Sequence, residues 1–280
     1  MRKKWQCRIA PSLGGGFAGT PNEVWGTVDY KDLDVDTIFF GLYGFPDFHS
    51  LWKHKGKKAI LWAGSDIRHF VNGYWLDDNG DIKIAPAPFA EWINNNCESW
   101  VENEVEQRAL YDVGISSRVT PSFLGDVKMF KKSYEWNSTP NFYTSVSGDD
   151  FYLYGWNLIP KLAKENPSVN FHLYGNTKKW KVPSKNVIVH GRVSQEQMNK
   201  EIMKMQGAIR LTEFDGFSEI LAKSVLWGQW PVSLISYPHM LRPQDIWTLR
   251  QKKVYEKYNR EGQNYYKKIL NNFPWNIKKK

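Results

Sequence analysis

Cysteine is scarce in this sequence, and long apolar runs are missing. The two cysteines, Cys7 and Cys97, lie far apart, which argues against a disulfide framework and a cysteine-based metal site. No run of eighteen apolar residues is present, so we expect no transmembrane helix. The basic start of the chain is not followed by an apolar segment, so we expect no signal peptide. These absences predict a cytoplasmic protein, with peripheral contact with a membrane left open.

Histidine is also sparse and shows no metal-binding spacing. None of the six histidines pairs with another at helical spacing or lies near a cluster of acids; they are His49, His54, His69, His172, His190 and His239. We therefore expect no metal ion and no bound cofactor.

Positive charge is concentrated at the end of the chain. The net charge is +9, and residues 241–280 hold 11 Lys and Arg against 3 Asp and Glu, a net of +8. The spacing of Trp247, Val254, Tyr258, Tyr265 and Ile269 predicts the packing face of a long helix. The basic residues Arg250, Lys252, Lys253, Lys257 and Arg260 would lie opposite that face. Such a face suits an anionic partner, although a solvated helix face explains it equally well.

The rest of the chain alternates predicted strands and helices, which is typical of α/β proteins with parallel sheets. The first half has predicted strands at 5–10, 35–44, 57–67 and 115–121, and a predicted helix at 98–113. The polar stretch 131–140 is a predicted hinge. Further strands are predicted at 141–146, 169–175, 186–191, 208–212 and 231–235, with helices at 154–165, 195–205 and 218–227. We expect a first domain at 1–138, a second at 139–240, and a basic helical tail at 241–280 that packs back on the first.

The stretch 210–232 is the strongest candidate for a functional site. A strand is followed by a tight acidic turn with Asp215 and Gly216, and Ser218 can cap the helix behind it. The free N–H groups of a helix start favour negative charge and can bind phosphate. The alternative is that Asp215 only caps the helix.

Two other turns follow predicted strands and are weaker candidates. Gly14, Gly15 and Gly16 follow the first strand and can admit a phosphate or sugar near the backbone; an ordinary loop is the alternative. Asp66 follows the third strand at the edge where α/β sheets bind ligands. The alternative for Asp66 is a cap on the helix beginning near Ile67.

The order strand, acidic turn, helix, Gly228 and Pro231-Val232 resembles the donor site of nucleotide-sugar glycosyltransferases of the GT-B fold. The similarity is to the retaining branch, glycosyltransferase family 4-like (glycosyl transferases group 1), whose motif has two Glu separated by seven residues. Asp215 matches the first acid, whereas Lys223 stands at the second. The motif is therefore degenerate. The resemblance implies two Rossmann-like lobes with a donor cleft between them.

The resemblance also implies a role for each matching residue. Asp215 would bind hydroxyls of the donor sugar, and Asp66 would lie on the acceptor side. The backbone of Gly216, Phe217 and Ser218 would bind the sugar or diphosphate, as would the glycines at 14–16. The remaining donor-site positions are Gly175 and Asn176 for the diphosphate and Gly191, Arg192 and Val193 for the base. Lys223 cannot accept the ribose hydrogen bonds of the second Glu; either Glu219 takes over part of that role, or Lys223 contacts phosphate instead.

The family's basic residues after the first strand of its second domain are absent here. Arg210 or Lys178, Lys179 and Lys181 can supply the positive charge that a departing diphosphate requires. The function implied is sugar transfer from a nucleoside-diphosphate sugar to a hydroxyl acceptor, with retention of configuration. The acceptor is a glycan, a lipid-linked sugar or, as the alternative, a hydroxymethylated base in DNA. A further alternative is an inactive, transferase-like binding module.

Overall fold

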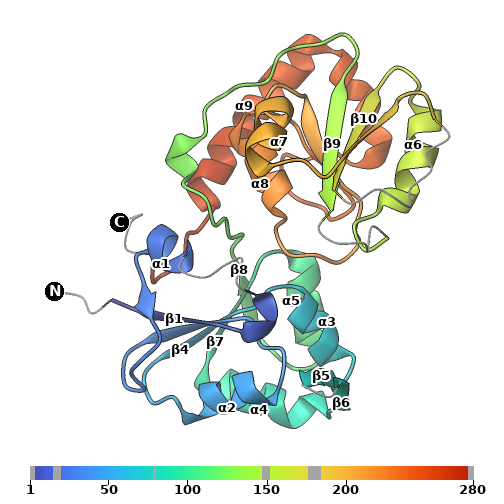
Figure 1. The fold of residues 1–280 in the computed structure, drawn as a ribbon. Helices are drawn as coiled ribbons and strands as arrows, with labels where there is room; N and C mark the ends of the chain where they lie inside the picture. Colours follow the sequence, from blue (N-terminus) through green and yellow to red (C-terminus); the bar gives the residue numbers. More distant parts are fainter. Residues whose placement is uncertain (1–3, 15–19, 78–79, 147–151, 176–183, 277–280) are drawn as a thin grey trace. The chain divides into compact units, whose positions relative to one another are not determined.

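The computed structural model describes residues 4–14, 20–77, 80–146, 152–175 and 184–276. The chain forms two compact units. Unit 1 comprises Met1–Asp126, Phe214–Phe217 and Ile269–Lys280, and unit 2 comprises Val127–Glu213 and Ser218–Lys268. Both units can be followed by colour in Figure 1. None of the helices in the described part of the chain is both long enough and apolar enough to cross a bilayer.

Unit 1 is built on a six-stranded sheet with the order β2-β1-β3-β4-β7-β8, in which every pair of neighbours is parallel. The strands are β1 (Gln6–Ile9), β2 (Val28–Asp29), β3 (Thr37–Phe40), β4 (Lys58–Leu61), β7 (Glu98–Val101) and β8 (Ser117–Val119). The helices are α1 (Thr20–Trp25), α2 (Phe45–Lys53), α3 (Ser65–Val71), α4 (Pro86–Asn96) and α5 (Glu104–Asp112). Short additions are the antiparallel hairpin β5 (Tyr74–Asp77) and β6 (Gly80–Lys83) and a 3-10 turn at Pro11–Leu13.

Both faces of this sheet are covered, as strand periodicity requires. Phe39 and Ile60 point into one core, together with residues of α2 to α5. Their neighbours Phe40 and Leu61 point into a second core, which α1 closes through the fully buried Trp25. Figure 1 shows α2 and α4 together on one side of the sheet.

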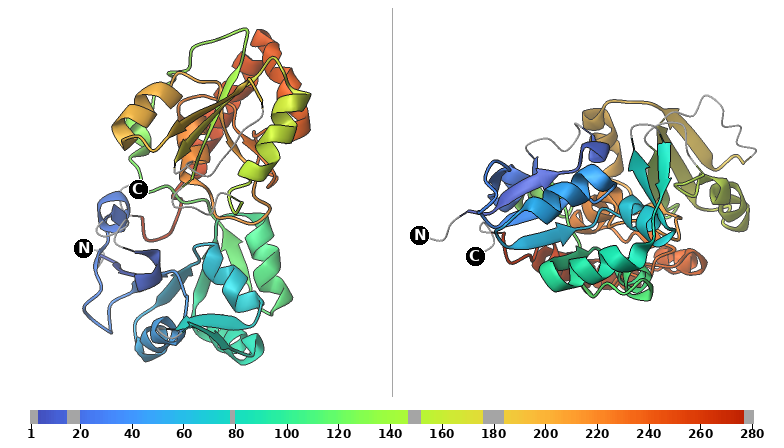
Figure 2. Two further views of the ribbon diagram at one scale, coloured as in Figure 1. Left: turned by 45° about the vertical axis from the view of Figure 1, so that its right-hand side comes forward. Right: turned by 90° about the horizontal axis from the view of Figure 1, so that it is seen from below.

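Unit 2 has a five-stranded parallel sheet with the order β11-β10-β9-β12-β13. Its strands are β9 (Asn141–Val146), β10 (Asn170–Gly175), β11 (Val187–Gly191), β12 (Gly207–Arg210) and β13 (Val232–Ser233). Its helices are α6 (Ile159–Glu165), α7 (Gln195–Ile202), α8 (Glu219–Leu226) and α9 (Lys252–Ile269), with 3-10 segments at Val127–Met129, Trp156–Leu158 and Pro243–Arg250. Helix α6 packs beside β10 and α8 beside β12 (Figure 2). The predicted α/β class is confirmed.

The helix predicted at 98–113 is wrong in its first third. Residues Glu98–Val101 form β7, and only Glu104–Asp112 are helical. The division lies at Asn103, whose side-chain oxygen accepts hydrogen bonds from the backbone N–H groups of Val105 and Glu106 and so caps α5.

The tail differs from the prediction in two ways. Helix α9 lies in unit 2, and only Ile269–Lys280 belong to unit 1. The buried face of α9 is also displaced by one residue from the predicted stripe: Tyr255, Asn259, Gly262 and Tyr266 are buried, whereas Val254, Tyr265 and Ile269 are only partly buried. The side chains of Trp247, Arg250 and Tyr258 lie outside what the structure describes.

Polar groups explain the displacement of this face. The Tyr255 hydroxyl donates to the carbonyl of Gln206, and the Tyr266 hydroxyl donates to that of Pro238. Gly262 permits close packing, because a Cβ atom there would lie 3.1 Å from the Cβ of His239. The spacing of apolar residues alone does not predict burial that depends on tyrosine hydroxyls and on a glycine.

The segment after α9 completes the second core of unit 1. Trp275 is fully buried and packs against Trp25 and Trp100, with ring centroids 6.4 and 5.5 Å away. Asn271 accepts hydrogen bonds from the Trp25 indole N–H and the Phe123 amide and donates to the Phe123 carbonyl. Residues from the end of the chain are therefore part of the first unit's core.

We predict that Trp275→Ala destabilises unit 1 by about 3–5 kcal/mol, because it leaves a large cavity in a packed core. Thermal unfolding followed by tryptophan fluorescence and circular dichroism measures the change. Trp52→Ala is the matched control, since Trp52 is 57% exposed and its loss should change stability by less than about 0.5 kcal/mol. Equal effects of the two substitutions would contradict the assignment of the terminal segment to the core.

Candidate functional site

The strand orders locate one ligand-binding position at the carboxyl edge of each sheet. In unit 2 the chain starts at the central β9, proceeds outward to β10 and β11, and then returns to β12 on the other side of β9. In unit 1 the corresponding reversal lies between β1 and β3. Ligands of open α/β sheets bind beyond the carboxyl ends of the strands at such reversals. Ligands are thus expected at the carboxyl ends of β9 and β12 in unit 2, and of β1 and β3 in unit 1.

In unit 2, Arg210 lies at this position. It is the last residue of β12 and is partly buried, and its guanidinium carbon lies 4.1 Å from the centre of the Tyr154 ring. Behind it, Gly155 packs so closely on β12 that a Cβ atom would lie 2.0 Å from the carbonyl oxygen of Leu211. The aromatic ring and the tight backbone contact hold a cation at the carboxyl edge.

The predicted glycines of unit 2 lie along the same edge. Gly175 ends β10 and Gly191 ends β11, with Tyr174 in register with Gly191. Packing also requires glycine at position 175, because a Cβ atom there would lie 2.3 Å from the carbonyl oxygen of Val146 in β9. Arg192 is exposed and Val193 is partly buried in the turn after β11. Asn176 and the lysines at 178, 179 and 181 lie outside the described residues.

Helix α8 begins where the sequence predicts, although its cap differs. Ser218 occupies the N-cap position, but its side chain makes no capping hydrogen bond. Glu219, in the first turn, is exposed, and Lys223 lies one turn further along on the same side and is partly buried. The helix ends at Gly228, with φ +74°, as predicted.

The acidic turn Phe214–Phe217 is built into unit 1. The Phe217 amide donates to the Glu102 carboxylate at 2.6 Å, and the Asn103 side chain donates to the Asp215 carbonyl oxygen at 2.7 Å. The Asp215 side chain is partly buried. The Phe217 N–H group, which the sequence predicts to bind the donor, thus already donates to a carboxylate of the protein; its contact with a donor stays a prediction.

Two glycines make this arrangement sterically possible. A Cβ atom on Gly216 would lie 2.2 Å from the Glu102 carboxylate, and one on Gly64 would lie 3.0 Å from the Gly216 nitrogen. Gly64 also has φ +88°, a conformation that favours glycine. The turns after β4 and β7 thus pack closely around residues 215 and 216.

Three acids without a described cationic partner lie around the acidic turn. Glu106 and Asp66 are fully buried, and Glu102 is partly buried. Burial raises the pKa of Glu102 to about 7, opposed by hydrogen bonds from Ser122 and Phe217. Burial, and then the charge of Glu102, raises the pKa of Glu106 well above its ordinary value. Burial and the neighbouring Glu102 carboxylate thus both favour the neutral form of Glu106.

Asp66 has a structural role. Its carboxylate oxygens accept hydrogen bonds from the backbone amides of Leu42, Ala63 and Ile67, and burial raises its pKa to about 7. These bonds join the ends of β3 and β4 to the start of α3. The side chain has no exposed surface, which agrees with the alternative of a local cap; a catalytic role for Asp66 stays a prediction.

Gly14 is exposed, with φ +70°, directly after the 3-10 turn that follows β1. Gly15 and Gly16 lie outside the described residues. Of the three predicted loop glycines, the structure thus describes Gly14, which lies near the carboxyl end of β1.

Sequence reasoning missed Glu102, Asn103 and Glu106. The pattern Asn103-x-x-Glu106 is a helix-start signal: Glu106 reaches back to accept a hydrogen bond from the Glu102 amide at 2.8 Å. This pattern was hidden by the helical spacing assigned to 98–113. The sequence also contains Asp-x-Asp at Asp32 and Asp34, in the connection before β3. That connection lies at the opposite, amino end of the strand.

Two histidines far apart in sequence meet on the sheet of unit 2. His172 Nδ1 lies 2.9 Å from His190 Nε2, and His190 Nδ1 lies 3.6 Å from a Glu201 carboxylate oxygen. Burial, and then His190, lowers the pKa of His172 to about 4. Within the described residues, no three metal-ligating side chains are arranged to hold a metal ion; the metal-free site remains a prediction.

No family model matches the chain, and no curated protein matches it. Solved structures do. TarM of S. aureus is 13% identical with a TM-score of 0.56, over 85% of this chain and 53% of TarM. HepE of Anabaena, in complex with UDP and glucose, is 8% identical with a TM-score of 0.53, over 83% of this chain and 74% of HepE.

The apo form of the lipopolysaccharide outer core galactosyltransferase WaaB is 11% identical with a TM-score of 0.53, over 98% of this chain and 97% of WaaB. The chain spans about half the length of TarM and nearly all of WaaB. At these identities the likeness concerns the fold: the chain has the GT-B glycosyltransferase fold, as predicted.

We predict that Glu106→Gln stabilises the protein at pH 7 by about 1 kcal/mol or more, because the amide keeps the acceptor for the Glu102 N–H group and cannot ionise. Raised pKa values mean that the folded state holds protons that the unfolded state releases. Wild-type stability should therefore fall as pH rises from about 4.5 to about 7, and Glu106→Gln should reduce this fall. Denaturant unfolding across this pH range measures it.

Glu102→Gln is the matched comparison. The Glu102 carboxylate accepts from Phe217 and from both the amide and the hydroxyl of Ser122, whereas an amide has a single acceptor oxygen. This variant should be less stable than wild type at pH 7. If both glutamines had the same effect, the different roles assigned to the two acids would be wrong.

Proposed function

We propose that this protein transfers a sugar from a uridine-diphosphate sugar to a hydroxyl acceptor, with retention of configuration. The GT-B fold supports the reaction class. UDP is present in the solved complexes of two structural neighbours, TarM and HepE, which supports the choice of nucleotide. The motif around Asp215 supports the retaining mode by its resemblance to that branch of the family.

The observation that carries the proposal is Arg210 at the carboxyl end of β12, beside the reversal of strand order. A leaving diphosphate carries negative charge that must be stabilised as the bond to the sugar breaks. A guanidinium can bind two phosphate oxygens in parallel. In our proposal Arg210 therefore replaces the basic residues that the family has after its first strand in this domain.

In the proposal, the other residues along this edge bind different parts of the donor. The turn Gly191–Val193 faces the base, and the backbone at Gly175 approaches the diphosphate. Neighbouring strands are about 4.8 Å apart, so β11, β10, β9 and β12 together span about 14 Å, enough for an extended nucleoside diphosphate. Glu219 accepts hydrogen bonds from the ribose in place of the family's second Glu, and Lys223 contributes charge near the phosphates.

Asp215 binds the sugar. Its turn is fixed by the hydrogen bond that the Phe217 amide donates and by the one that the Asp215 carbonyl oxygen accepts, and in the proposal the carboxylate binds hydroxyls of the donor sugar. In the proposal, the backbone of Gly216 and Ser218 also contacts the sugar or the diphosphate. In the reaction the bond from sugar C1 to the diphosphate oxygen breaks, the acceptor oxygen bonds to C1, and the acceptor proton passes to the released diphosphate.

We predict that Arg210→Ala raises the dissociation constant for UDP about 10- to 100-fold, because a charged hydrogen bond contributes about 1.5–3 kcal/mol. Isothermal titration calorimetry with UDP measures it. Arg118→Ala is the control, since its guanidinium is exposed and lies 3.8 Å from Glu98. If wild type fails to bind UDP and the diphosphates of the other nucleosides, the donor-site proposal is wrong and the inactive module is left.

We predict that Asp215→Asn lowers kcat for hydrolysis or transfer of the donor sugar about 100-fold or more, while UDP affinity changes little, because in the proposal Asp215 binds the sugar part of the donor and not the UDP part. Release of UDP from a panel of UDP-sugars, assayed with and without acceptor, measures kcat. An Asp215→Asn enzyme with wild-type turnover would remove Asp215 from the mechanism.

The acceptor is proposed to be a glycan or lipid-linked sugar. One observation favours the alternative of a hydroxymethylated DNA base: Lys252, Lys253, Lys257 and Arg260 are exposed on α9. Binding through phosphates weakens steeply with salt. A gel shift of duplex DNA that is lost on raising the salt concentration would favour DNA; unshifted DNA at low salt would leave the glycan.

A further inference from the structure

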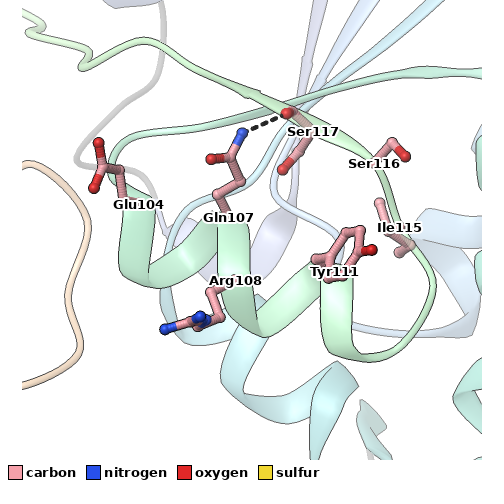
Figure 3. A pocket seen from close by; sticks show the side chains of 7 residues that line it. All are labelled: Glu104, Gln107, Arg108, Tyr111, Ile115, Ser116 and Ser117. Carbon is pink, nitrogen blue, oxygen red and sulfur yellow. Dashed lines mark hydrogen bonds between the residues drawn. The ribbon is translucent and has the colours of Figure 1, made fainter.

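The outward face of α5 forms an open groove. Its lining comes from Glu104, Gln107, Arg108 and Tyr111 of the helix and from Ile115 and Ser116 of the segment that follows, and its volume is about 520 Å³ (Figure 3). This volume lies within the range of small-molecule sites. The groove belongs to unit 1 and has no part in the donor site proposed above.

The groove has the chemistry of a saccharide site. The Tyr111 side chain is 72% exposed, so its ring offers an apolar face and a hydroxyl that can accept or donate. The amide of Gln107, the guanidinium of Arg108 and the carboxylate of Glu104 are planar groups that can each make paired hydrogen bonds with neighbouring hydroxyls.

Charge argues against an anionic ligand. The lining contains one cation, Arg108, and one anion, Glu104, so it offers no net attraction to phosphate or to a nucleotide. Both signs together suit a neutral ligand with many donors and acceptors. Gln107 is already oriented, because its side-chain nitrogen donates to the carbonyl oxygen of Ser117 at 2.7 Å (Figure 3); its other amide atoms remain available.

The groove also starts next to the acidic turn. Glu104, at one end, follows Asn103, whose side chain donates to the Asp215 carbonyl oxygen. Tyr111, at the other end, lies seven residues further along the helix. At about 1.5 Å per residue the groove therefore extends about 10 Å from the region of the turn, which is long enough for more than one sugar residue.

We propose that this groove binds a neutral oligosaccharide and holds the part of a glycan acceptor that lies beyond the reacting sugar. The acceptor role rests on the proposed transferase function, whereas saccharide binding by the groove stands separately. Tyr111 and Arg108 are then the residues that select glycans of more than one sugar.

The test measures binding of maltotriose, cellotriose and triacetylchitotriose to the full-length chain by ligand-observed NMR titration. At least one should bind, and Tyr111→Ala should weaken its binding about tenfold, since truncation of an aromatic contact costs more than about 1 kcal/mol. Arg108→Ala should also weaken it. Trp52→Ala, which removes an exposed aromatic side chain from α2, should leave the affinity unchanged.

Unchanged melting temperatures verify that the variants fold. UDP titrations on the same variants separate this proposal from the donor site: UDP affinity should be the same in Tyr111→Ala as in wild type. Absence of binding by all three sugars, or equal binding to wild type and Tyr111→Ala, would overturn the groove proposal. Tyr111-dependent sugar binding without any UDP binding would support saccharide binding by the groove and contradict the proposed transferase function.

Discussion

The hydrogen bond from the Phe217 amide to the Glu102 carboxylate is the interaction on which the account of the site depends. At 2.6 Å it fixes the only turn that carries the candidate sugar-binding acid. It works because Gly216 leaves room for the carboxylate and Gly64 leaves room for the Gly216 backbone. A side chain at either glycine would displace the turn, and with it Asp215. The position of Asp215 is thus decided by Glu102 and Asn103 in the connection between β7 and α5, far from it in sequence.

Burial of acids around this turn has an energetic consequence. Glu102, Glu106 and Asp66 have raised pKa values because water is excluded, and hydrogen bonds from backbone amides offset only part of that effect. Protonation of Glu106 would remove the repulsion between two adjacent carboxylates, and the raised pKa of Glu106 favours that state. The acids around the turn are therefore linked to proton uptake on folding.

Much of the fold was predictable from the sequence because strand and helix periodicities are local. The β-α order of unit 2, the helix end at Gly228 and the start of α8 near Ser218 follow from patterns within a few residues. Helix 98–113 was mistaken because Trp100, Val101 and Val105 fit a helical spacing even though Asn103 interrupts it. The face of α9 was displaced because Tyr255 and Tyr266 are buried through hydroxyl hydrogen bonds as well as packing.

The site was less predictable than the fold because its contacts are long-range. No local pattern relates Glu102 to Phe217 or brings His172 to His190, since parallel sheets join residues through crossovers of many residues. The sequence located Gly175 and Gly191 at strand ends and Arg210 within a strand predicted at 208–212; the structure ends that strand at Arg210, and the parallel order of unit 2 places all three along one edge. The sequence could not show that Asp66 is buried or that the Phe217 amide is already bonded.

A crystal structure of the protein with bound UDP tests the central claim most directly. We predict the diphosphate within about 4 Å of the Arg210 guanidinium, as paired hydrogen bonds require, with uracil against the Gly191–Val193 turn. UDP bound elsewhere on the chain, with Arg210 still stacked on Tyr154 and the edge of the unit 2 sheet empty, would contradict the account.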